Sequence, residues 1–72
     1  MDRSTDDLVK IVAAGGGLIL DAEGKSTDEL MKIVRAAGKG EALVTIRNMG
    51  EKTTEELISL AAAGDGMVVF EL

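Results

Sequence analysis

The stretch STDELMKIVRAAGKG (residues 26–40) decides the fold, because close variants of it occur three times in the chain. STDDLVKIVAAGGG (4–17) precedes it and TTEELISLAAAGDG (53–66) follows it, with one extra residue in the middle copy near Arg35. A short apolar segment comes after each copy: LILDA, EALVTIR and MVVFEL. Internal repeats of roughly 20–50 residues are typical of chains in which each copy folds into the same small unit. The sequence therefore predicts three tandem units.

Each copy begins and ends like a helix. A hydroxyl residue at the N-cap is followed three positions later by an acid, which predicts a capping box in all three copies: Ser4 and Asp7, Ser26 and Glu29, Thr53 and Glu56. Glycines just past the last turn predict left-handed C-caps at Gly15, Gly38 and Gly64. We expect helices over about residues 5–14, 27–37 and 54–63.

The same copies repeat an apolar stripe at positions i, i+3 and i+4, which is the spacing of one buried helix face. Its members are Leu8, Ile11 and Val12, then Leu30, Ile33 and Val34, and finally Leu57, Leu60 and Ala61.

The apolar segments that follow the glycines are short and rich in β-branched residues, so we expect strands over about residues 18–22, 42–47 and 67–71. Alternation places Ala42, Val44 and Ile46 on one face of the second strand, and Val68, Phe70 and Leu72 on one face of the third. In the first strand Leu18 and Leu20 alternate with Ile19 and Asp21, which leaves open a register shifted by one residue.

Alternating helices and strands predict an α/β fold with a parallel sheet. Right-handed crossovers would place every helix on one side, and identical units would give the strand order 1-2-3 in a single repeat domain spanning residues 1–72. The other face of this three-stranded parallel sheet would then be uncovered. It would carry Leu43, Met67, Val69 and either Ile19 or Leu18, with Thr45 and Arg47 beside them.

An uncovered apolar sheet face requires a partner. A chain of 72 residues buries a small core, and with no Cys and no His it has neither disulfides nor the usual metal ligands to reinforce that core. We therefore expect a homo-oligomer, in the simplest case a dimer that stacks sheets or joins edge strands.

The turn DAEGKST (21–27) stands between a strand and a helix and invites comparison with a phosphate-binding loop. That loop requires a glycine five positions before Gly24, where this chain has Ile19, and the helix that follows opens with Asp28 and Glu29. A calcium loop would likewise need its first carboxylate at Ile19. The matching turn NMGEKTT (48–54) favours a plain turn and helix cap, so we expect no cofactor and no metal.

The residue inventory argues against catalysis, because the chain has no His, Cys or Tyr and each visible Ser, Thr or carboxylate already has a structural role. We expect a protein that is not an enzyme and has no catalytic residues. A net charge of −5 opposes nucleic-acid binding, and no apolar run approaches the length of a membrane span. With no signal-peptide pattern, a cytoplasmic location is expected.

Acidic residues in the first turn of each helix would line up as a row if the units stack. This acidic row consists of Asp6, Asp7, Asp28, Glu29, Glu55 and Glu56. Good helix capping explains the row by itself. The alternative is a negative strip that binds a basic protein partner, as in small acidic inhibitors of phage or mobile-element origin of the anti-CRISPR kind.

The strand LVTIRN (43–48), with Val44 and Ile46 two residues apart and Asn48 one position before the asparagine of the pattern L-x-L-x-x-N, resembles a leucine-rich repeat with a full helix in each unit. The chain is also similar to short bacterial and phage proteins built of TxxEL…AAG repeats. The leucine-rich-repeat resemblance implies a mini-solenoid that binds protein through its strand face. Together with the bare face, it predicts a protein-binding or scaffolding domain.

Overall fold

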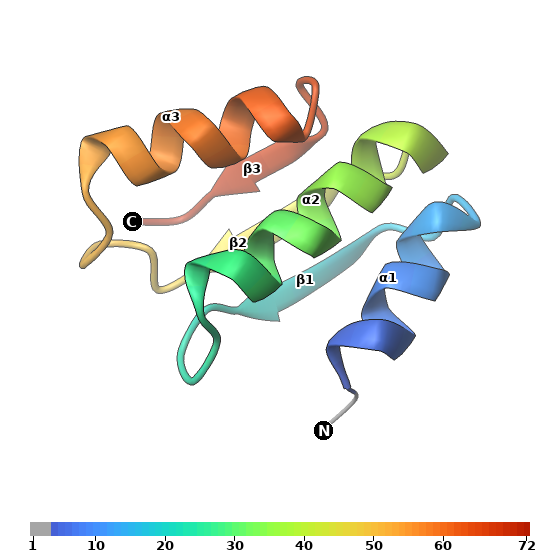
Figure 1. The fold of residues 1–72 in the computed structure, drawn as a ribbon, viewed down its shortest axis with the longest axis horizontal. Helices are drawn as coiled ribbons and strands as arrows, with labels where there is room; N and C mark the ends of the chain where they lie inside the picture. Colours follow the sequence, from blue (N-terminus) through green and yellow to red (C-terminus); the bar gives the residue numbers. More distant parts are fainter. Residues whose placement is uncertain (1–3) are drawn as a thin grey trace.

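The computed structural model describes residues 4–72 and shows an α/β fold of two layers (Figure 1). Helices and strands alternate along the chain: α1 (Thr5–Ala13), β1 (Leu18–Asp21), α2 (Thr27–Gly40), β2 (Val44–Arg47), α3 (Thr54–Ala63) and β3 (Val68–Phe70). The strands form a parallel sheet in the order β1-β2-β3. This is the expected fold class, with element ends that differ from the predicted ones by up to three residues.

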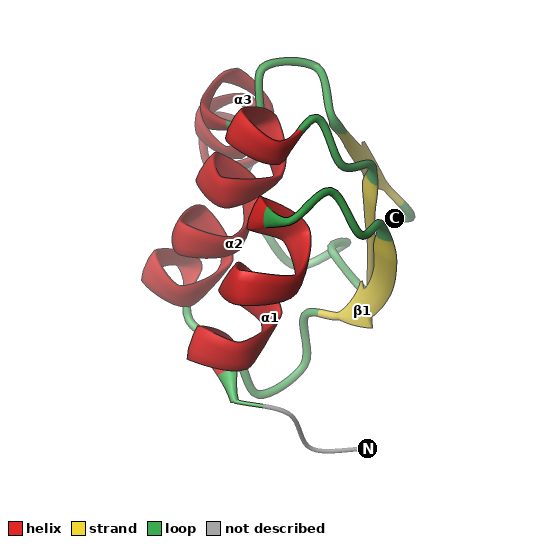
Figure 2. Ribbon diagram, turned by 90° about the vertical axis from the view of Figure 1, so that its right-hand side faces the viewer, coloured by secondary structure: helices red, strands yellow, loops and turns green. Residues whose placement is uncertain are grey.

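All three helices cover one face of the sheet, and the opposite face carries no described element (Figure 2). α1 packs on α2 and α2 on α3, so that neighbours in sequence are neighbours in space. Each helix therefore lies beside the strand that follows it.

The N-caps form where the sequence predicted them. Ser26 and Thr53 each accept a hydrogen bond from the amide three residues on, while Glu29 and Glu56 accept from the amides of these cap residues. In α1 only the first half forms: the Asp7 amide donates to the Ser4 hydroxyl at 3.2 Å. The aspartate side chain is one methylene shorter than glutamate, which explains why the reciprocal bond is not made.

The C-terminal glycines behave differently from the prediction in two helices. Gly15 has a φ of +98° directly after the C-cap of α1, as expected. α2, however, continues through Gly38 and ends at Gly40, and its left-handed residue is Glu41 with a φ of 55°. After α3 the left-handed residue is Asp65, not Gly64. Gly38 is needed instead for close packing, because a Cβ there would lie 3.1 Å from the Gly64 carbonyl oxygen.

The register of the sheet settles the ambiguity of the first strand. Leu18 pairs with Val44 and Leu20 with Ile46, so β1 is not shifted relative to β2. β3 continues the same rows, with Val68 beside Val44 and Phe70 beside Ile46. Leu72, expected on the core side, is 80% exposed because it lies beyond the end of β3.

The core is centred on α2 and β2, the middle unit. α2 supplies five buried side chains, whereas α1 and α3 supply one each, Val12 and Leu60. The buried hydrophobic residues are Val12, Leu20, Ala22, Leu30, Ile33, Val34, Ala36, Ala37, Ala42, Val44, Ile46, Met49 and Leu60. Within residues 4–72 the outer units have a neighbouring unit on one side only, and Ile11 and Ala61 of the predicted stripes are accordingly exposed.

Candidate functional site

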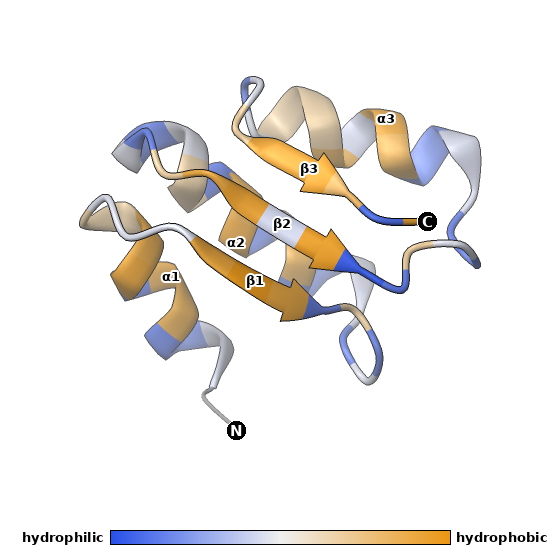
Figure 3. Ribbon diagram, turned by 180° about the vertical axis from the view of Figure 1, so that it is seen from behind, coloured by the Kyte–Doolittle hydropathy of each residue, from blue (hydrophilic) through white to orange (hydrophobic). Residues whose placement is uncertain are grey.

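The helix-free face of the sheet is apolar at the N-terminal ends of its strands (Figure 3). Ile19, Thr45 and Val69 lie side by side across the three strands. Ile19 is 72% exposed, Val69 44% and Leu43 52%. Met67 and Thr45 are half-buried. The predicted interface residues on the apolar half thus lie together, and Ile19, which the sequence left in competition with Leu18, joins them.

The other half of this face is charged. Asp21, Arg47 and Glu71 follow one another across the ends of the strands, and Arg47 Nε donates to Glu71 Oε1 at 3.2 Å. Asn48 Nδ2 donates to Asp21 Oδ2 at 2.6 Å. Both contacts are exposed, so they add little stability but set a polar border on the apolar patch.

Two carboxylates of the acidic row accept hydrogen bonds from the preceding helix, and the other four are exposed. Glu29 accepts from the Thr5 hydroxyl at 2.9 Å, and Glu56 accepts from the Thr27 hydroxyl at 3.0 Å, so each joins its own helix to the preceding one. Asp6, Asp7, Asp28 and Glu55 are exposed. The units therefore do bring the first turns together, but two of the six carboxylates are committed to helix contacts.

Hydrogen bonding changes the acidity of the two engaged carboxyls. The pKa of Glu29 lies below its ordinary value, chiefly because the Ser26 amide donates to it and then because Thr5 does. The pKa of Glu56 is lowered in the same way, first by the Thr53 amide and then by Thr27. Lys25 and Lys52 contribute smaller charge effects in the same direction. Lys52 also donates to the Thr27 hydroxyl at 3.1 Å.

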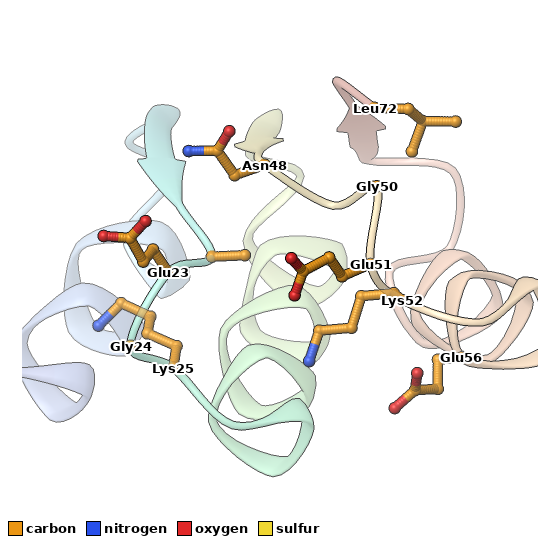
Figure 4. A pocket seen from close by; sticks show the side chains of 10 residues that line it. Glu23, Gly24, Lys25, Asn48, Gly50, Glu51, Lys52, Glu56 and Leu72 are labelled. Atoms are coloured by element: carbon orange, nitrogen blue, oxygen red, sulfur yellow. The ribbon is translucent and has the colours of Figure 1, made fainter.

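A cleft of about 580 Å³ opens where the strands end and the helices begin, as parallel sheets commonly provide (Figure 4). Its lining includes Glu23, Lys25, Asn48, Glu51 and Lys52. Lys25 extends away from Lys52, so the two ammonium groups do not converge on one point. Within residues 4–72 no group of three or more Asp, Glu, His or Cys side chains is arranged to hold a metal ion.

The sequence interpretation missed this cleft, although the ends of parallel strands meeting at one edge were a usable signal. It also missed Met49, which is fully buried behind the turn after β2. No periodicity marks that position, because Met49 lies outside both the strand and the helix.

The chain matches no protein-family model, no curated protein and no solved structure. Of the helices in the described residues, none combines the length and apolarity needed to cross a membrane.

Proposed function

We propose that this chain is a non-enzymatic protein-binding or scaffolding domain that packs the bare face of its sheet against a second copy. The observation that carries the proposal is the row Ile19, Thr45 and Val69, which lies with Leu43 on a face that no helix covers. Parallel sheets are usually covered on both sides, and contiguous exposed apolar groups mark interaction surfaces.

The placement and chemistry of the face support a second copy as its partner. The molecule measures 29 × 26 × 18 Å, and the shortest dimension runs through the two layers, so the bare sheet lies on a broad side of the molecule. In a dimer related by a two-fold axis the same patch is used by both copies, so the apolar half of one face packs on the apolar half of the other.

The test is the solution mass of the chain with Leu43→Lys and Val69→Lys together. Both side chains are about half exposed, so the fold should survive while the added charges separate the copies. Ser59→Lys with Ala62→Lys adds the same charge to exposed positions of α3 and serves as the control. At low concentration and low salt, light scattering should show a dimer for the unmodified and control chains and a monomer for the face variant. A face variant that keeps the dimer mass under these conditions would reject the proposal.

The acidic inhibitor remains the second candidate, supported by the exposure of Asp6, Asp28 and Glu55 along one edge. Reversing these three charges should abolish capture of a basic protein while leaving the mass and the circular dichroism unchanged. Unchanged capture by the reversed chain would remove this candidate.

A further inference from the structure

The contact between successive units uses the same sequence positions twice. Thr5 of α1 donates to Glu29 of α2, and Thr27 of α2 donates to Glu56 of α3. These threonines are each the first residue after an N-cap, and the glutamates are each the third. Each helix–strand unit thus presents the donor on the side that faces the following unit and the acceptor on the side that faces the preceding unit.

Burial follows the same rule along the helices. The fifth position after the cap is half-buried and packed against the core in α1 and α2, where a further unit follows, but Ile58 at this position in α3 is 62% exposed. The seventh position is fully buried in α2 and α3, where a unit precedes, but Ile11 in α1 is 37% exposed. Ile58 and Ile11 are therefore exposed at positions that are covered wherever the described chain has a neighbouring unit on that side.

The outer side of the α1–β1 unit, called here the α1 end, and the outer side of the α3–β3 unit, called the α3 end, therefore carry complementary surfaces of the kind that meet between successive units. At the α1 end, a groove of about 830 Å³ is lined by the apolar Leu8, Ile11, Leu18 and Leu20, with Asp21, Glu23 and Lys25 at its charged part. At the α3 end, Ile58 is exposed, and the Thr54 hydroxyl has no acceptor within residues 4–72, unlike the hydroxyls of Thr5 and Thr27. β1 and β3 each pair with β2 alone, so both outer edges of the sheet are open within these residues.

We propose that copies of this chain join end to end, with the α3–β3 end of one copy seated on the α1–β1 end of the next. Thr54 of one copy faces Asp7 of the next, Ile58 enters the groove at the α1 end, and β3 pairs with β1 to continue the parallel sheet. The occupant is a second copy because the surface that fits each end is the one at the other end, as the α1–α2 and α2–α3 contacts show. The contact is heterologous, so it produces rings or open chains of copies.

This joint is separate from the face-to-face contact and is expected to be weaker. The end of the molecule includes its short 18 Å dimension, so it is narrower than the broad side that carries the bare sheet. Continuing the register also places Glu71 beside Asp21 of the next copy, and like charges directly opposite one another oppose pairing. Association through the ends should therefore grow tighter as salt screens these charges.

The experiment uses the 72-residue chain carrying Leu43→Lys and Val69→Lys, which removes the face contact. Sedimentation velocity over a range of concentrations should show a series of species that differ by one copy and that increase with salt. Adding Ile58→Lys should leave only monomer, whereas the neighbouring Ser59→Lys should leave the series unchanged. Circular dichroism checks that each variant is folded.

A variant that should associate more tightly provides the second test of the end-to-end joint. Asp7→Glu restores the side-chain length found at the two internal joints, so it should tighten end-to-end association about three- to tenfold, the value of one added hydrogen bond. The same change in a Thr54→Val background should give no tightening. A strictly monomeric face variant at every concentration, or a gain from Asp7→Glu that persists without Thr54, would overturn the end-to-end joint. Either result would leave the face-to-face proposal standing, which fails only if the face variant keeps the dimer mass at low concentration and low salt.

Discussion

Replacing Gly40 with alanine tests the packing of the outer helix α1. A Cβ at this position would lie well inside contact distance of the Val12 carbonyl oxygen and 2.9 Å from that of Ala13. Both atoms belong to the backbone of α1, so neither can rotate away as a side-chain end would. Relief requires the end of α1 and the end of α2 to separate by about 1 Å, at a cost near the upper end of the 1–3 kcal/mol typical of overpacking.

The opposing effect is small. Alanine is favoured over glycine in a helix by about 1 kcal/mol, and less at the last helical position. The net loss should therefore be about 2 kcal/mol, out of a total of about 4–11 kcal/mol expected for a domain of this size. At roughly 4–8 °C for each kcal/mol, the melting temperature should fall by about 8–16 °C.

Urea denaturation followed by circular dichroism measures the change, and hydrogen exchange locates it. Exchange should rise first in α1, whose only fully buried side chain is Val12. Gly50→Ala is the matched control, because the nearest atom to its Cβ would be 3.8 Å away and its φ is not positive. The control should stay within about 0.5 kcal/mol of the unmodified chain. A Gly40→Ala chain as stable as that control would refute the close approach of α1 and α2.

Two further changes test the core and the helix caps. Met49→Ala should cost about 2–5 kcal/mol in urea denaturation, because the side chain is fully buried. Glu56→Gln should reduce the acid sensitivity of folding: a carboxyl whose folded pKa is lowered stabilises the fold fully above its unfolded pKa of about 4.3, and this stabilisation is lost as the pH falls through the folded value. Melting temperatures of both chains between neutral and acid pH provide the comparison. A Met49→Ala chain with unchanged stability would contradict the burial, and parallel pH profiles for the Glu56 pair would contradict the lowered pKa.

The sequence alone predicted the helix starts and the strand faces, because both depend on local chemistry. A hydroxyl cap with an acid three residues later forms wherever the helix forms, and Ser26 and Thr53 behave as expected. Alternation likewise identified Val44 and Ile46 as core residues before any neighbour was known. The exposed positions of Leu43 and Val69 followed from the same alternation, once the helices were assigned to the other face.

Tertiary structure decided the features that depend on a neighbouring unit. The sequence predicts a helix end at Gly38, yet both Gly38 and Gly40 lie within α2, where the backbone of a neighbouring helix end comes too close for a Cβ. Ile58 and Ile11 have the sequence character of core residues, yet each is exposed because its neighbour on one side is missing from the described chain. Local pattern determines which side chains a unit offers for burial, whereas only the stacking of units decides which of them are covered.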